Sequence, residues 1–102
     1  MADIKQARKV VIARIVEDDG RAPQAQRRAA FENTGLADPL RTLVDKVARH
    51  AHRVTDADIG AARSAGFTED QIFELVVCAA IGQANRQYDN ACAALEAAME
   101  KG

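Results

Sequence analysis

The sequence predicts an all-α fold, and three observations carry that prediction. Apolar residues recur at the i, i+3, i+4 and i+7 spacing of a helix face, and no segment shows the period-two alternation of a half-buried strand. Alanine, the strongest helix former, occupies 22 of the 102 positions, and only four residues are aromatic. Residues that cap or break helices separate the periodic segments. We expect a single all-α domain over residues 1–102, built as a helical bundle.

The first predicted helix begins at Asp3, which can cap it, with Gln6 three residues later. One face of this helix is apolar and comprises Ile4, Ala7, Val11, Ile12, Ile15 and Val16. The acidic run at residues 17–19 and then Gly20 end the helix, because negative charge is unfavourable at a helix C-terminus.

A short, arginine-rich second helix opens with Pro23 at its first position, and we expect Phe31 to anchor it to the core. The stretch "ENTGLADPL" then breaks the chain. Asn33 and Gly35 in this stretch tolerate the positive φ of a turn.

The third predicted helix has Asp38 as its cap and Pro39 as its first residue. Its apolar face comprises Leu40, Leu43, Val44, Val47, Ala48 and Ala51. Asp45 and Arg49 lie four residues apart, which favours an ion pair on the exposed side of the helix.

Two further helices complete the bundle. Thr55 and Asp58 begin a short one that Gly66 ends. In the last helix Thr68 and Gln71 form a capping box, and Phe67 and Ile72 are spaced as a hydrophobic staple. This helix carries an apolar stripe of Phe73, Val77, Ile81, Ala84, Tyr88, Ala91, Leu95 and Met99, with Gly82 as the expected place for a bend.

The composition predicts a homo-oligomer. Alanine buries little surface, so an alanine-rich core in a small domain gains stability by docking against another copy. Residues 1–53 contain eleven Lys and Arg against seven Asp and Glu, whereas residues 54–102 contain three against eight. This asymmetry fits either solvated helix faces or complementary surfaces that meet between subunits.

Several other classes of protein are disfavoured. The net charge of −1 favours neither nucleic acid nor an acidic membrane. The segment from Thr55 to Val76 resembles a helix-turn-helix, but its second helix opens with Thr-Glu-Asp-Gln, which repels phosphate. No signal peptide or membrane span is expected. Cys78 and Cys92 lie about 21 Å apart on one predicted helix and cannot bridge within it, so we expect a reducing, cytoplasmic location.

The segment "VTDADIGAARSAGFTEDQIFELVVCAAIGQANRQ" resembles the carboxymuconolactone decarboxylase and alkylhydroperoxidase D-like superfamily. The resemblance rests on Thr55-Asp56, Ala65-Gly66, "FTEDQI", the apolar run from Leu75, and Asn85-Arg86. It covers residues 37–99 as the core of the fold and leaves residues 1–36 as an N-terminal helical extension. The resemblance implies an all-α, alkylhydroperoxidase D-like helical bundle that forms oligomers.

The peroxidase branch of that superfamily uses a Cys-x-x-Cys pair followed four residues later by His, with a Glu upstream. In such a pair one thiol has a lowered pKa and its partner resolves the oxidised sulfur. Counting back from Gly66 places Ala51 and Val54 at the two cysteine positions and Asp58 at the histidine position. This registration therefore supplies no thiol.

A second registration matches Glu74 to the upstream acid of the family. It places Arg86 and Asp89 at the cysteine positions and Ala93 at the histidine position. Because neither registration retains a thiol, the resemblance implies a member without thiol peroxidase activity.

Five residues are candidates for chemistry or packing. Cys78 lies in an apolar segment that raises the pKa of a thiol, so packing is favoured over reactivity, and the same holds for Cys92. Glu74 lies in "IFELVV", and we expect it on a rim of the helix that faces water or an arginine of a partner. The alternative is a buried carboxylate that needs a partner or a raised pKa, as in a general acid. Arg86 is expected in an ion pair or subunit contact, with a ligand carboxylate as the alternative. His50 borders an apolar face near a helix C-terminus, where we expect a cap or surface histidine.

His52 falls on the charged side of the same helix as His50. The two rings would point about 200° apart on that helix and could not share a metal ion. We expect no metal ion and no cofactor.

Three functional hypotheses follow. The leading one is an oligomeric structural or small-ligand-binding protein. The alternative is an acid–base enzyme of the decarboxylase or lactone type that uses Glu74 with His50 or Arg86. A second alternative is a single-thiol redox protein that uses Cys78.

Overall fold

The structure is a computed structural model that describes residues 2–101, with side chains described from residue 6 to residue 100. Over this part of the chain the fold is entirely helical. The elements are α1 (Ala2–Glu17), α2 (Gln24–Glu32), α3 (Leu40–Arg49), the short 3₁₀ turn η1 (Ala51–Arg53), α4 (Asp56–Ser64) and α5 (Glu69–Lys101). No strand occurs among these residues. The all-α prediction is confirmed.

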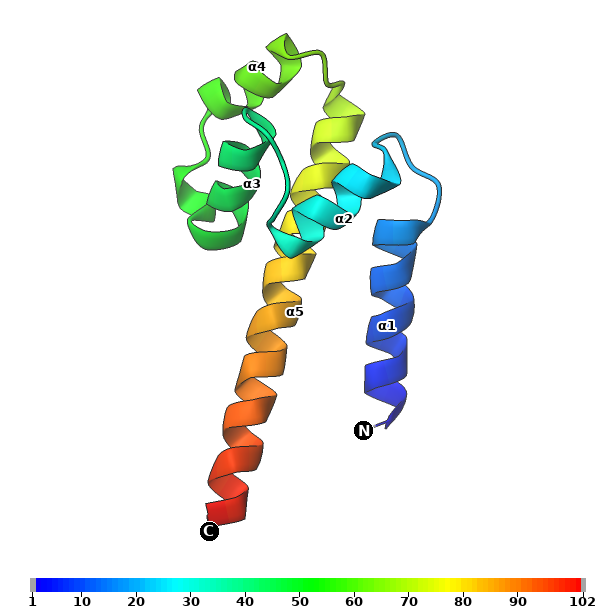
Figure 1. The fold of residues 1–102 in the computed structure, drawn as a ribbon, viewed down its shortest axis with the longest axis vertical. Coiled ribbons are helices and arrows are strands. Elements are labelled where there is room, and N and C mark those ends of the chain that lie inside the picture. The colour runs from blue at the N-terminus through cyan, green and yellow to red at the C-terminus, as the bar shows by residue number, and fades with distance from the viewer. Residues whose placement is uncertain (1, 102) are drawn as a thin grey trace.

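Helix α5 forms the long axis of the molecule (Figure 1). Helices α2, α3 and α4 gather around its first half, and α1 runs antiparallel to it on another side. The second half of α5 continues past the start of α1 (Figure 1). The radius of gyration is 15.5 Å, whereas about 13 Å is typical of a compact domain of this length. None of the helices described combines the length and the apolar character needed to cross a bilayer.

The core lies between the first half of α5 and the helices α2, α3 and α4. Its largest fully buried side chains are Leu43, Val44, Leu75 and Cys78. The rest of the buried cluster comprises Ala22, Ala30, Leu40, Ala62, Ile72 and Ala79, so half of the cluster's ten members are alanine or cysteine. Ala22 and Ala30 precede residue 37, so the predicted N-terminal extension contributes part of the core.

Helix α2 crosses α5 at Gly82. A Cβ atom added at Gly82 would lie 1.9 Å from the backbone oxygen of Phe31 and 2.7 Å from its carbonyl carbon. Only glycine permits this approach, because no side chain separates the two backbones. Helix α5 runs through Gly82 without interruption, and the glycine serves helix packing.

The predicted helix ends in the second half of the chain are confirmed. Thr55 and Asp58 form a reciprocal capping box at the start of α4. At the start of α5, the Thr68 hydroxyl accepts a bond from the Gln71 backbone at 3.1 Å, and the Gln71 side chain accepts one from the Thr68 backbone at 2.9 Å. Gly66, which precedes this box, has a φ of +103°.

The turns of the first half lie where the sequence predicts them, although Pro23 and Pro39 are the N-cap residues of α2 and α3 and not their first residues as predicted. Pro23 directly precedes α2, and Asn33 and Gly35 adopt φ values of +53° and +82°. The Asp38 carboxylate accepts a bond from the Thr42 backbone at 3.1 Å at the start of α3. Helix α1 already includes Ala2, so Asp3 lies within the helix and not at its predicted cap position.

The two histidines do not share a helix as predicted, although the expected cap or surface position is confirmed for His50, which is the C-cap residue of α3 and is exposed. Helix α3 ends at Arg49, so His50 and His52 lie in the following turn and not on a common helix. Their ring centroids are 6.2 Å apart in an edge-on arrangement, and both side chains are exposed. Ala51, predicted on the apolar face, is exposed for the same reason.

Replacement of Gly82 by alanine should destabilise the protein by about 1–3 kcal/mol or more, because the new methyl group collides with the backbone of Phe31. Chemical denaturation followed by circular dichroism measures the effect. Gly60→Ala in α4 is the matched control: a Cβ there meets nothing within 4 Å, and the change should stabilise the protein by about 0.4–1 kcal/mol. Equal stability of Gly82→Ala and the wild type would contradict the close crossing of α2 and α5.

Candidate functional site

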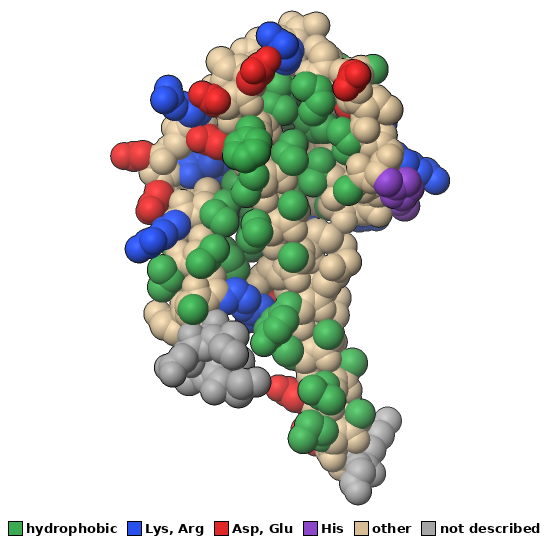
Figure 2. Space-filling view, turned by 180° about the vertical axis from the view of Figure 1, so that it is seen from behind, with side chains coloured by type: hydrophobic (Ala, Val, Ile, Leu, Met, Phe, Trp, Pro, Cys, Tyr) green, Lys and Arg blue, Asp and Glu red, His purple; other side chains and the backbone are tan. Residues whose placement is uncertain are grey.

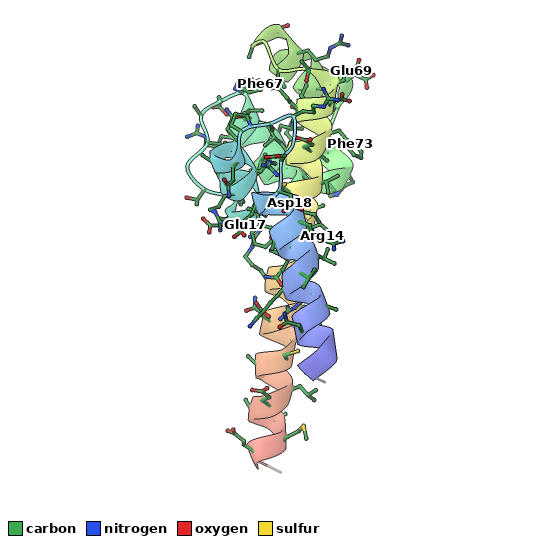
Figure 3. The ribbon with its side chains drawn as sticks, turned by 90° about the vertical axis from the view of Figure 1, so that its right-hand side faces the viewer. Arg14, Glu17, Asp18, Phe67, Glu69 and Phe73 are labelled. Carbon is green, nitrogen blue, oxygen red and sulfur yellow. The ribbon has the colours of Figure 1, made fainter. Side chains whose placement is uncertain are left out.

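Glu74, the leading candidate for acid–base chemistry, binds the backbone of the loop between α1 and α2. One carboxylate oxygen accepts a bond from the Arg21 backbone and the other accepts one from the Ala22 backbone, both at 2.7 Å. Both oxygens therefore serve to hold the loop on α5. Figure 3 labels Glu17, the last residue of α1, and Asp18, which follows it at the start of this loop.

Two neighbouring side chains reinforce this contact. The Gln71 amide donates to the carbonyl of Arg21 at 3.0 Å. Arg27, which is only 5% exposed, donates from Nε to the carbonyl of Ala22 and from Nη1 to the carbonyl of Ile15, both at 3.1 Å. We call Glu74, Gln71 and Arg27 the loop clamp, because together they fix the chain between α1 and α2.

The groups around Glu74 favour its ionised form. Burial alone would raise the pKa of Glu74, but the backbone donors of Arg21 and Ala22 and the positive charges of Arg27 and Arg21 outweigh burial, so its pKa is lowered. A general acid at neutral pH needs the opposite shift. The pKa of Glu74 therefore suits a structural anion.

The two cysteines differ in environment. Cys78 is 1% exposed, and its sulfur lies 3.8 Å from the carbonyl of Ile15. Burial raises the pKa of the Cys78 thiol, as predicted for a packing residue, and this suppresses the thiolate that redox chemistry requires. Cys92 is half-buried one turn after Tyr88, and its side chain raises the pKa of Tyr88. Both thiols are free.

Arg86 stabilises the end of α2. Its guanidinium donates to the carbonyl of Phe31 at 2.6 Å and to the side chain of Gln83 at 2.9 Å. Phe31 lies in the last turn of α2, where backbone carbonyls have no partner within the helix. Arg86 thus reinforces the crossing of α2 and α5 at Gly82, which is a role other than the predicted ion pair. His50, by contrast, is exposed on the turn after α3.

These contacts keep Glu74, His50 and Arg86 in separate places. Glu74 binds the loop after α1, Arg86 binds the end of α2, and His50 lies beside His52. None of the three lines the hollow between α1 and α5, the hollow beside α3 or the hollow between α4 and α5. The acid–base alternative therefore lacks a shared cavity in this fold.

The most apolar hollow lies between α1 and α5 and has a volume of about 400 Å³. Its lining consists of Arg8, Val11, Ile12, Ile81, Ala84, Asn85 and Tyr88. Arg8 fixes α1 to one rim of this α1/α5 hollow: it donates to Asn85 and to Asp89, both at 2.9 Å, and its guanidinium carbon lies 4.5 Å from the centre of the Tyr88 ring.

A second hollow, of about 440 Å³, lies between the 33–36 turn and α3 and is lined by three cations. Arg41 pairs with Asp38, Lys46 with Asp58 and Arg49 with Asp45, at 3.0, 2.9 and 3.1 Å. The last pair was expected from the sequence. Because each cation already has a carboxylate partner, this hollow does not present an uncompensated positive charge to an anion.

A third hollow, shallow and mostly apolar, lies between α4 and α5 and is lined in part by Ile59, Ile72, Phe73 and Val76. Phe73 is 69% exposed and projects outward from α5 (Figure 3). Among the described residues, no group of three or more His, Cys, Asp and Glu side chains is placed to hold a metal ion.

In comparisons with known proteins, no family model, curated protein or solved structure matches the chain. The geometry of the site is therefore the basis for assigning function.

Sequence reasoning missed two arginines that organise the site. Arg27 lies four residues before Phe31 and so shares the helix face expected to meet the core, which is the signal that could have found it. Arg8 lies next to the predicted apolar stripe of α1, one turn before Val11 and Ile12. Its partners on α5 are more than 75 residues away in sequence, so local spacing could not reveal them.

Glu74→Gln should lower the free energy of unfolding by about 1–3 kcal/mol at pH 7, because it removes the charge that strengthens the two loop bonds. The pKa of Glu74 is lowered in the folded state, so its stabilisation is present above the ordinary carboxyl pKa and is lost as the pH falls through the folded value. The difference from the wild type should therefore vanish at low pH. Denaturation at several pH values tests this, with Glu32→Gln, at an exposed position, as the control.

An aromatic disulfide reagent should modify Cys92 and spare Cys78 in the folded protein, because Cys78 is buried and its pKa is raised. The measurement is the rate of thiol release before and after addition of denaturant. In Cys92→Ser, thiol release should begin only on unfolding. Rapid modification of folded Cys92→Ser would instead support the redox alternative at Cys78.

Proposed function

We propose that this protein acts by self-association, as a small helical structural protein without thiol peroxidase activity. The observation that carries the proposal is the exposed second half of α5. Every residue from Gln87 to Glu100 is exposed except the half-buried Cys92, and Leu95 and Met99 are 61% and 71% exposed. Such a short helical segment is marginal in water without a packing partner.

The same apolar character extends to α1. Figure 2 shows apolar side chains along the facing sides of α1 and α5, continuing down the second half of α5. Val10 and Val11 on α1 are 40% and 51% exposed, and Tyr88 on α5 is 40% exposed. Contiguous apolar surface of this kind marks an interaction site in a small protein.

The environments of the polar candidates support a structural function over catalysis. The Glu74 carboxylate has both oxygens bound to the loop after α1, and Cys78 is buried among core residues. Arg86 is bound to the end of α2. Glu74 thus holds a loop on α5, Cys78 fills the core and Arg86 joins α5 to α2. These structural contacts account for the three side chains without a catalytic role.

Binding of a small apolar molecule is a second candidate function, favoured by the α1/α5 hollow. Its volume of about 400 Å³ falls within the usual range for small-molecule sites of roughly 300–1,000 Å³. Arg8 and Asn85 at its rim would orient a polar group of such a molecule.

The resemblance to the carboxymuconolactone decarboxylase and alkylhydroperoxidase D-like superfamily is part of this proposal. The all-helical architecture and the capping boxes at Thr55 and Thr68 support it. In that interpretation, the chain is a member that uses the helical scaffold for assembly and has no pair of redox thiols.

Sedimentation velocity should show a species heavier than the 11.0 kDa chain, and its fraction should rise with protein concentration over about 1–100 µM. Association is expected because it covers the apolar surface that the single chain exposes. A folded chain that sediments as a monomer throughout this range would refute the proposed function.

A further inference from the structure

The exposed second half of α5 carries a regular pattern of large and small side chains. Ile81, Tyr88 and Leu95 recur every seven residues, and Ala84, Ala91 and Ala98 recur at the same interval between them. The successive spacings are therefore three, four, three, four and three residues. Such a 3–4 pattern places all six side chains on one stripe of a helix, the arrangement of a coiled-coil seam. We call these six residues the seam.

The seam borders the α1/α5 hollow over its first half and is exposed over its second half. Ala84, Ala91 and Ala98 are all exposed, and Leu95 is 61% exposed. Helix α1 reaches the seam at Ile81 and Tyr88, where both helices line the α1/α5 hollow. A further helix laid along the seam would therefore also close that hollow.

The alternation selects the orientation of the partner helix. In a parallel pair of identical helices, the large residues would face each other in some layers and the alanines would face each other in the rest. In an antiparallel pair the two rows of the seam oppose each other, so every large side chain meets an alanine. Facing large and small residues interdigitate without gaps. The seam thus fits a second copy of itself in antiparallel orientation.

The charged side chains of α5 lie away from the seam, so they would not repel those of an identical helix packed along it. Between residues 75 and 99 the charged side chains are Arg86, Asp89 and Glu96. At 100° per residue, all three point about 110° or more away from the centre of the seam. Two copies therefore meet along the seam without placing like charges opposite each other.

We propose that α5 pairs antiparallel with α5 of a second copy along the seam, so that Leu95 of each chain meets Ala84 of the other at the α1/α5 hollow. The same register pairs Tyr88 with Ala91 and Ile81 with Ala98. The interface is isologous and closes as a dimer with two-fold symmetry. With α1 beside α5 in each copy, the assembly is a four-helix bundle. This inference rests on the proposed function and specifies its interface.

A pair of matched variants tests the interface. Ala91→Glu places a charge on the seam, and Ala93→Glu places the same charge two residues away on the opposite side of the helix. Both alanines are exposed in the single chain, so neither change disturbs its core. Ala91→Glu should raise the dissociation constant of the dimer at least about 100-fold, because the charge is buried without a partner, while Ala93→Glu should leave it unchanged. Circular dichroism verifies that both variants fold.

Cysteine cross-linking tests the orientation. In a Cys92→Ser background, equimolar Ala84→Cys and Leu95→Cys chains should form a mixed disulfide dimer under mild oxidation, identified by intact mass. Each variant alone should cross-link poorly, since positions 84 are about 16 Å apart along the axis of an antiparallel pair. Cross-linking of each variant with itself, without the mixed product, would indicate a parallel pair and overturn the proposed register.

The outcomes separate this inference from the proposed function. An oligomer that Ala91→Glu does not weaken overturns the seam as the interface and leaves self-association standing. A wild-type chain that stays monomeric overturns both the seam and self-association. If that monomer also binds an anilinonaphthalene sulfonate dye and Val11→Glu abolishes the binding, the result favours an apolar ligand in the α1/α5 hollow.

Discussion

The close contact between the backbone of Phe31 and Gly82 is the constraint on which the rest of the structure depends. It draws α2 onto α5 closely enough for Arg86 to bond the carbonyl of Phe31. Once α2 lies there, Arg27 projects from it to the end of α1 and to the loop that follows. A short sequence of contacts, each made possible by the previous one, thereby folds the first third of the chain against α5.

Polar residues in this protein hold helices together where a larger apolar core would otherwise do so. Alanine and glycine at the helix crossings bring backbones close but bury little surface. The loop clamp compensates, because a carboxylate, an amide and a guanidinium satisfy four backbone groups between α1 and α2. The residues that look most like catalytic groups in the sequence are therefore occupied in structural hydrogen bonds.

The thin core also explains the exposed surface. Helices α2, α3 and α4 cover only the first half of α5, and the α1/α5 contact depends largely on Arg8. The apolar residues of the second half of α5 are left without a partner in the single chain. Self-association would complete the same packing scheme, since small residues again meet large ones along a helix.

The sequence by itself determined the helical class, most helix boundaries and the chemistry of the capping residues. These features depend on contacts within about four residues, as the boxes at Thr55 and Thr68 illustrate. The burial of Cys78 and its raised pKa also followed from its apolar neighbours in the chain. Local composition was sufficient because the neighbours on α5 face the same core.

Only the tertiary structure decided the roles of Glu74, Arg86, Arg27 and Gly82. The partners of each lie on another helix or in a loop, and those of Glu74 are more than 50 residues away. The sign of the Glu74 pKa shift shows why: burial among its apolar neighbours would raise the pKa, whereas backbone donors from a distant loop lower it. Hydrogen-bond partners depend on how helices cross, and the crossing is set by packing that no local pattern records.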